Sequence, residues 1–114
     1  MKWINQTESV NPYYNLAMEE YVLKNRADDV FLLWQNDNTI VIGRNQNTLE
    51  EINLDYVKEQ NITVARRMSG GGAVYHDLGN LNFSFAVQND EKQYFDFAKF
   101  AAPVIALLEE FGVK

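Results

Sequence analysis

Residues 66–77 read Arg66-Arg67-Met68-Ser69-Gly70-Gly71-Gly72-Ala73-Val74-Tyr75-His76-Asp77, and they hold three of the six glycines and the single histidine of this 114-residue chain. Adjacent glycines leave their backbone N–H groups unshielded and reach backbone angles closed to other residues, so a ligand can lie against the main chain. A guanidinium beside several free N–H groups suits a phosphate or a carboxylate. This segment indicates an anion-binding site, and its residues 67–73 are called the glycine-rich loop below.

A plain turn explains the glycines equally well, because the loop lies between two predicted strands and glycine clusters are common in hairpins. Two nucleotide-binding motifs are excluded. The Gly-Lys-Ser/Thr ending of a Walker loop and the Gly-x-Gly-x-x-Gly spacing of a dinucleotide fold are both missing. From the glycines alone, the anion site and the turn both remain open.

The side chains around the glycines favour a binding site. Arg66 and Arg67 are neighbours on a predicted strand and point to opposite faces, so we expect one to serve the ligand and the other to face solvent or an acid. Ser69 adds a hydroxyl. A lone histidine is more often structural than catalytic, so His76 is predicted to line the site without acting as a general base. Asp77 is predicted to start a turn.

The rest of the chain predicts an α+β fold with a mixed, largely antiparallel sheet and flanking helices. Asn11 and Pro12 are typical of a helix start, and Gly112 of a helix end. The polar residues 36–38 predict a hairpin turn between two strands. The predicted elements are helices at 13–26, 54–60 and 96–111, the last with Pro103 as a kink, and strands at 30–34, 39–42, 62–66 and 81–88.

Two further segments bear on the site. The polar loop at 43–47 is a turn by itself, but beside the glycine-rich loop it could form another wall of one pocket. In the strand at 81–88 apolar and polar residues alternate, which predicts that Phe83 and Phe85 face the core. The acids of the helices, Glu19 among them, are interpreted as solvated faces.

Composition excludes several classes of function. The chain is 46% hydrophobic, enough for the core of one domain, and its 16 acidic against 10 basic residues give a net charge of -6, which argues against a nucleic-acid surface. It has no cysteine, so disulfides and thiolate chemistry are excluded. The sequence has no second histidine and no paired acids at ligand spacing near His76, so we expect no metal ion bound by protein side chains. No signal peptide or membrane span is apparent, and we expect a soluble, cytoplasmic protein.

Three segments closely resemble the N-terminal part of lipoate–protein ligases, in the class II synthetase-like fold family shared with biotin–protein ligases and octanoyltransferases. They are residues 15–20, 41–47 and, above all, 66–83, and the last is far more specific than a bare glycine triplet. The resemblance covers nearly the whole chain. It implies that residues 1–114 are the N-terminal portion of a single catalytic domain, truncated at its C-terminus.

The resemblance implies a two-step reaction. Lipoate and ATP give lipoyl-adenylate and pyrophosphate, and a lysine of a lipoyl-domain protein then takes the lipoyl group. The implied acceptors are 2-oxoacid dehydrogenase subunits and the glycine cleavage H protein, and Mg²⁺ is expected with ATP, held through phosphates and water. Carried over by position, the ATP and adenylate contacts are Arg67, Gly72, Ala73, Val74 and Tyr75, and the lipoate pocket is lined by Arg44, Ser69, Gly70, Gly71 and His76.

Three alternatives stay open beside the ligase. The first is an octanoyl- or lipoyl-transferase, or a biotin-attaching enzyme, of the same fold. The second is a ligand-binding remnant without catalysis. In the third, the loop only shapes the sheet, and replacing Arg67 with alanine would leave ligand binding unchanged.

The resemblance also generates a test of activity. The family's catalytic lysine lies in a later segment, after a Gly-Arg-Asn-Asp strand, and Lys114 does not match it. We therefore expect these 114 residues alone to lack useful adenylating activity. A pyrophosphate-release assay with lipoate and ATP should show no more turnover than the same assay without lipoate, and normal turnover would contradict the expectation.

Overall fold

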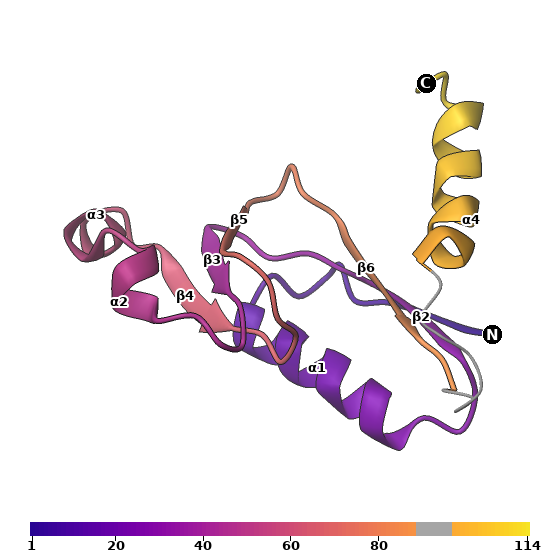
Figure 1. The fold of residues 1–114 in the computed structure, drawn as a ribbon, viewed down its shortest axis with the longest axis horizontal. Helices are drawn as coiled ribbons and strands as arrows, with labels where there is room; N and C mark the ends of the chain where they lie inside the picture. Colours follow the sequence, from indigo (N-terminus) through magenta and orange to yellow (C-terminus); the bar gives the residue numbers. More distant parts are fainter. Residues whose placement is uncertain (89–96) are drawn as a thin grey trace.

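The computed structural model describes residues 1–88 and 97–114, in which six strands and four helices are interspersed along the chain (Figure 1). No helix among these residues is long and apolar enough to cross a membrane. The predicted helix start at Asp96 lies outside the described residues. The strands are β1 (Lys2–Asn5), β2 (Val30–Trp34), β3 (Thr39–Ile42), β4 (Thr63–Arg66), β5 (Val74–His76) and β6 (Asn82–Ala86), and the helices are α1 (Pro12–Asn25), α2 (Thr48–Glu51), α3 (Leu54–Glu59) and α4 (Phe97–Glu110).

The strands form two three-stranded sheets, in the orders β1-β2-β6 and β4-β3-β5. Each sheet has one parallel and one antiparallel pairing: β2 is parallel to β1 and antiparallel to β6, and β3 is parallel to β4 and antiparallel to β5. The predicted α+β class with flanking helices is confirmed. The strands divide between two mixed sheets instead of forming one.

The predicted hairpin between residues 30–34 and 39–42 is wrong. Both edges of β2 are taken by β1 and β6, and both edges of β3 by β4 and β5, so these two strands cannot pair with each other. The connection between them leads from one sheet to the other. The glycine-rich loop is not a hairpin turn either, because β3 lies between the two strands that the loop connects, β4 and β5.

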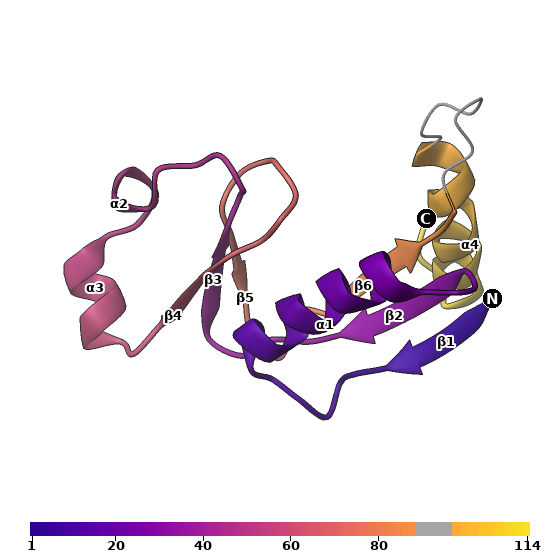
Figure 2. The same cartoon turned by 90° about the horizontal axis from the view of Figure 1, so that it is seen from below.

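The start of α1 is as predicted. Oδ1 of Asn11 accepts hydrogen bonds from the backbone N–H groups of Tyr13 and Tyr14, and Pro12 occupies the first turn, where its missing N–H leaves no bond unmade. Figure 2 shows α1 along one face of the β1-β2-β6 sheet. There Val22 packs with Val30 and Ala86 in a buried apolar cluster.

At the other end of the chain, Pro103 lies inside α4 without ending it. Gly112 has a φ of 82°, and Val113 N–H reaches back to the carbonyl of Leu108. The predicted glycine C-cap is confirmed, because this left-handed conformation favours glycine.

The face of β6 is the reverse of the one predicted. Phe83 is 46% exposed, whereas Ala86 is buried and Ser84 is half-buried on the side that carries α1. Ser84 turns inward because its hydroxyl accepts a hydrogen bond from Trp34 and donates one to Glu19. Phe85 stacks instead against Phe31, with 4.9 Å between the ring centroids. The alternation therefore predicted the strand correctly and its buried face wrongly.

A pair of buried amides ties α1 to both sheets. Asn15 and Asn36 are fully buried, and Nδ2 of Asn15 lies 2.8 Å from the carbonyl oxygen of Gln35, 3.0 Å from that of Ser9 and 2.9 Å from Oδ1 of Asn36. Asn36 in turn contacts His76 on β5. The amide pair thus holds the helix, the end of β2 and the strand after the glycine-rich loop in one arrangement.

The glycine-rich loop and the loop at 43–47 touch through their backbones. Arg44 N–H donates to the carbonyl of Ser69 over 2.9 Å, and Arg67 N–H donates to that of Ile42 over 3.0 Å. At Gly43, a Cβ atom would lie only 2.2 Å from the carbonyl oxygen of Gly71. Only glycine permits this approach, so the two loops form adjoining walls, as predicted.

Replacing Asn15 with leucine, which has a similar branched shape but no polar atoms, should destabilise the fold. Each buried carbonyl left without its donor costs about 1–3 kcal/mol, and urea unfolding should report at least that loss. Asn25→Ala is the matched control, because Asn25 lies on the same helix, is exposed and should change stability by less than about 0.5 kcal/mol. Equal effects of the two variants would contradict a structural role for the buried amide pair.

Gly43→Ala should also destabilise the protein, by about 1–3 kcal/mol, because the new methyl group forces the two loops apart. Gly70→Ala provides the comparison, since no atom lies within 4 Å of its Cβ position. Thermal or urea unfolding of both variants measures the difference. If Gly43→Ala were as stable as Gly70→Ala, the loops would not depend on this contact.

Candidate functional site

Arg67 organises the glycine-rich loop. Its Nη2 donates to the carbonyl oxygens of Gly70 and Gly72, both over 2.8 Å, and its Nη1 donates to that of Val41 over 3.3 Å. Gly71 lies beneath this guanidinium with a φ of 106°, and a Cβ there would stand 2.9 Å from Nη2. The loop therefore curls around a positive charge, and Gly71 has both a backbone and a steric reason to be glycine.

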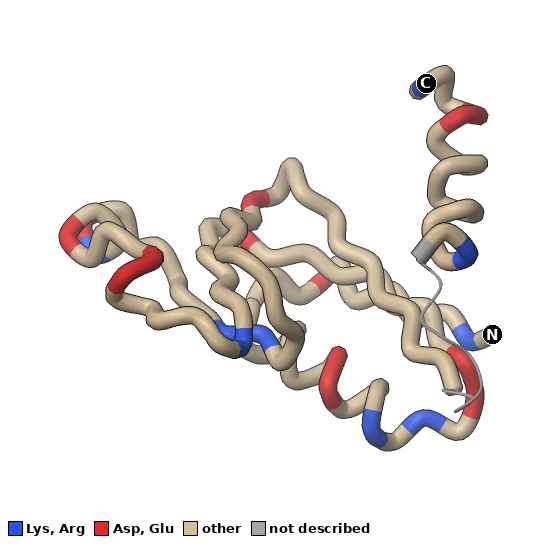
Figure 3. Tube along the Cα trace, in the orientation of Figure 1, with Lys and Arg blue, Asp and Glu red and all other residues tan. Residues whose placement is uncertain are grey.

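Arg66 holds the neighbouring loop. Its Nη1 donates to the carbonyl oxygens of Gly43, Arg44 and Gln46, and its Nη2 donates to Oγ1 of Thr48. Arg66 is exposed, as expected for the arginine that does not serve the ligand, and its hydrogen bonds to the loop carbonyls are a further role that the sequence did not predict. Figure 3 shows the resulting group of basic residues where the two loops meet.

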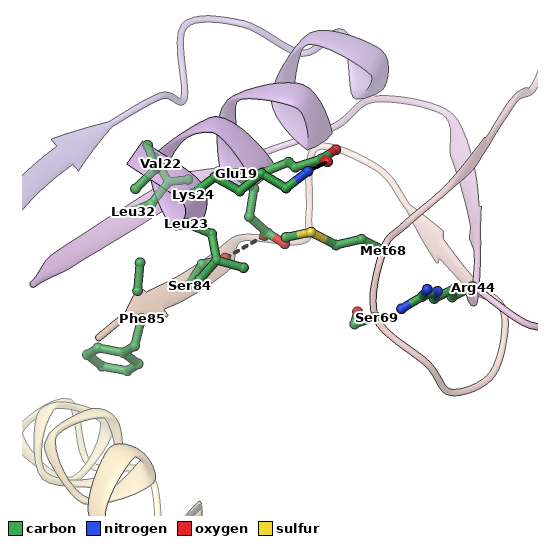
Figure 4. Close-up of a pocket in the computed structure, with 12 residues that line it drawn as sticks. Glu19, Val22, Leu23, Lys24, Leu32, Arg44, Met68, Ser69, Ser84 and Phe85 are labelled. Atoms are coloured by element: carbon green, nitrogen blue, oxygen red, sulfur yellow. Dashed lines mark hydrogen bonds and ion pairs between the residues drawn. The ribbon is translucent and has the colours of Figure 1, made fainter. Parts of the chain in front are cut away.

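A cavity of about 660 Å³ opens between α1, β6 and the two loops (Figure 4). Arg44 and Ser69 lie at one end of it, and apolar side chains, including Val22, Leu32 and Phe85, lie at the other. Such a cavity suits a ligand with an apolar chain and an anionic head. The residues that line it are Glu19, Glu20, Val22, Leu23, Lys24, Leu32, Arg44, Met68, Ser69, Ser84, Phe85 and Ala86.

A relay of hydrogen bonds forms part of the cavity wall. Nε1 of Trp34 donates to Oγ of Ser84 over 3.0 Å, and Ser84 donates to Oε2 of Glu19 over 2.6 Å. Glu19 therefore presents an oriented carboxylate to the cavity instead of facing solvent as predicted. Sequence reasoning missed this, because Glu19 and Ser84 are 65 positions apart and nothing in the local sequence pairs them.

His76 is a buried residue at the end of β5. It is 8% exposed, its Nδ1 lies 3.1 Å from Nδ2 of Asn36, and its ring meets that of Trp34 edge-on with 6.0 Å between the centroids. Burial first, and then the positive charge of Arg67, lower the pKa of His76 below its ordinary 6.5. The ring is therefore neutral at pH 7.

Tyr75 lies on the opposite face of β5 from His76, because side chains alternate along a strand. Its hydroxyl donates to Oδ1 of Asn38 over 2.8 Å, and it is 52% exposed. It lines a second cavity, of about 530 Å³, together with residues of α3 such as Tyr56. The side chain of Tyr75 is thus separated from the cavity that Arg44 and Ser69 line.

The predicted site residues therefore form two groups. Of the predicted lipoate-pocket residues, Arg44 and Ser69 line the first cavity, Gly70 and Gly71 belong to the loop beside it, and His76 lies on β5 against Asn36. The predicted nucleotide contacts run from Arg67, bonded to Gly72, into β5, where Val74 is 46% exposed. Within residues 1–88 and 97–114, no three His, Asp or Glu side chains gather where they could hold a metal ion.

Comparison with known proteins identifies the family. Residues 11–114 match the family model of the lipoyl protein ligase A/B catalytic domain. Lipoate–protein ligase 1 of Staphylococcus aureus is 50% identical over 115 residues, which cover 99% of this chain and 35% of that protein. This chain therefore spans about a third of the length of that curated relative.

Two solved structures are similar in fold as well as in sequence. The two-part lipoate–protein ligase of Thermoplasma acidophilum, studied with its E2 lipoyl domain, superimposes with a TM-score of 0.76 at 33% identity, over 90% of this chain and 40% of that one. A lipoate–protein ligase A bound with ATP gives a TM-score of 0.74 at 34% identity, over 90% of this chain and 42% of that one. On the family match and the 50% identity over nearly its whole length, this chain belongs to the lipoyl protein ligase A/B catalytic domain family.

Proposed function

We propose that this chain contributes the lipoate and nucleotide-binding half of a lipoate–protein ligase, which activates lipoate with ATP and transfers the lipoyl group to a lysine of lipoyl-domain proteins. The observation that carries the proposal is the cavity that joins apolar walls to Arg44, Ser69 and the glycine-rich loop. The Staphylococcus aureus relative is a lipoate–protein ligase by name, and one solved neighbour binds ATP.

Lipoate fits the first cavity by its chemistry. Its hydrocarbon chain and dithiolane ring are apolar, and its carboxylate is an anion, which matches a cavity with Val22 and Leu32 at one end and Arg44 at the other. A volume of about 660 Å³ lies in the ordinary range for sites of small ligands. In this orientation the carboxylate lies beside Ser69, where the glycine-rich loop begins.

The nucleotide belongs on the other side of that loop. Arg67 and the backbone from Gly72 to Tyr75 can hold the phosphates, and the guanidinium can balance the charge that develops at the α-phosphate when the carboxylate attacks. ATP enters as its Mg²⁺ complex, with the metal held through phosphate oxygens and water. We propose no catalytic residue among residues 1–114, because none of their lysines matches the family's catalytic lysine.

The acceptors are proteins that carry a lipoyl domain. The Thermoplasma acidophilum neighbour was studied with its E2 lipoyl domain, which supports this class of partner. Within the class, we propose 2-oxoacid dehydrogenase subunits and the glycine cleavage H protein. The proposed reaction takes place in the cytoplasm and involves neither nucleic acid nor membrane.

Arg67 offers the most direct test of the binding role. Isothermal titration with lipoyl-adenylate should show binding by the wild-type chain and an affinity about 10- to 100-fold lower for Arg67→Ala, because hydrogen bonds to charged groups contribute about 1.5–3 kcal/mol. Arg67→Lys should restore only part of the affinity, since one ammonium cannot replace the two guanidinium nitrogens that reach Val41, Gly70 and Gly72 together.

Lys58→Ala is the matched control, because it also removes one positive charge, from the last turn of α3 and away from both loops. Its affinity should equal that of the wild type. Equal affinity of Arg67→Ala and the wild type would mean that the loop only shapes the sheet. The absence of any binding heat with the wild type would contradict the proposed function itself.

A further inference from the structure

The three side chains Asn15, Asn36 and His76 form a chain of hydrogen bonds whose direction is fixed from one end. Nδ2 of Asn15 faces the carbonyl oxygens of Ser9 and Gln35, at 3.0 and 2.8 Å. A carbonyl can only accept, so the group of Asn15 that faces these two oxygens must be its NH₂. Rotating the amide by 180° would put Oδ1 against both oxygens.

The same reasoning fixes the next amide. The NH₂ of Asn15 also lies 2.9 Å from the side chain of Asn36. An NH₂ of Asn36 at that position would set two donors against each other, so the facing atom is Oδ1, which shares the two hydrogens of Asn15 with the two carbonyls. The NH₂ of Asn36 therefore points the other way, toward Nδ1 of His76 at 3.1 Å. Asn36 has no freedom to present an acceptor to the imidazole without losing its bond to Asn15.

The tautomer of His76 follows from this arrangement. A donor faces Nδ1, so Nδ1 must be the unprotonated, accepting nitrogen of the neutral ring, and the proton resides on Nε2. Nε2 has no hydrogen-bond partner among the described residues. His76 therefore has one N–H group available to a ligand.

The surroundings of His76 contain one charge that acts on it, the guanidinium of Arg67. Two of the other side chains packed around it are neutral. Trp34 of β2 meets the imidazole ring edge-on, and Thr39 of β3 is paired with His76 in the sheet. A neutral N–H donor close to a guanidinium suits an anionic oxygen, because it adds a hydrogen bond without adding a second charge that would have to be desolvated.

We propose that Asn36, oriented by Asn15, is a positioning residue that holds His76 as the neutral Nε2–H tautomer, and that this N–H donates to an anionic oxygen of the ligand bound at the glycine-rich loop. The donor role of Nε2–H toward the ligand rests on the function proposed above. The claim that Asn36 fixes the tautomer of His76 concerns the protein without a ligand. The two can be tested on the same sample.

His76 is the only histidine of the chain, so its two ring nitrogens give the only imidazole signals in a long-range ¹H–¹⁵N spectrum. Above pH 7, the wild type should show Nδ1 unprotonated and Nε2 protonated. The titration midpoint should lie below 6.5, since burial and Arg67 lower the pKa. An Nδ1–H tautomer in the wild type would overturn the proposal without any variant.

Asn36→Asp reverses the bond, because a carboxylate can only accept. It should raise the pKa of His76 and place the proton of the neutral ring on Nδ1. Below this raised pKa the imidazolium still carries Nε2–H, but above it Nε2 becomes an acceptor. Affinity for lipoyl-adenylate should therefore fall about tenfold or more as the pH rises through the midpoint measured by NMR, whereas the wild type should show no such fall.

Asn36→Leu keeps the branched shape of the side chain and removes the amide. Asn15 keeps two carbonyl acceptors for its two hydrogens, so the change leaves none of its donors unpaired. This variant should show a mixture of tautomers and weaker binding without a pH step. Asn61→Asp is the matched control, because Asn61 is exposed and its φ of 52° is tolerated by aspartate. It should reproduce the wild-type tautomer and affinity.

The outcomes separate the two proposals. If the wild type binds lipoyl-adenylate and Asn36→Asp shows no pH step at the His76 midpoint, Asn36 is merely structural and this inference fails, while the proposed function stands. If the wild type shows the Nε2–H tautomer and binds no adenylate at any pH, the proposed function fails and the donor role fails with it. A pH step that coincides with the NMR midpoint supports both.

Discussion

The buried contact between Asn15 and Asn36 is the constraint on which the site depends. It lies where α1, the end of β2 and, through His76, β5 meet, so one pair of amides sets the position of the helix relative to both sheets. The first cavity lies between α1, β6 and the loops that precede β5. A shift of either amide would therefore change the shape of the cavity as well as the stability of the fold.

The electrostatics of the site come from a few well-placed groups. The chain carries a net charge of -6, yet Arg66 and Arg67 both donate to backbone carbonyls where the two loops meet. Each guanidinium fixes the backbone of one loop by donating hydrogen bonds to its carbonyl groups, so the positive charge of the guanidinium lies next to that loop. An acidic protein can therefore carry a positive potential at one loop, because local geometry, not the net charge, decides the potential there.

Much of the fold could be predicted from local sequence. Asn11 and Pro12 start α1, the apolar runs give β2 and β3 with correct bounds, and Gly112 ends α4, because each of these signals acts within a few residues. The pairing of strands could not be predicted, since it depends on which edges are free. The face of β6 was predicted wrongly because Ser84, a polar residue, finds partners in Trp34 and Glu19 that only the folded chain supplies.

The candidate site was predictable in its motif and not in its connections. The glycine-rich loop, Arg67 and His76 stand out in the sequence, but Asn36 does not, and Arg67 bonds to the loop itself in a way that spacing cannot show.

The central claim is that lipoyl-adenylate spans the first cavity and the glycine-rich loop. A crystal structure of the protein with lipoyl-adenylate should show the acyl chain between α1 and β6 and the phosphate beside Arg67. An acyl chain in the second cavity, against Tyr75 and α3, would contradict the claim.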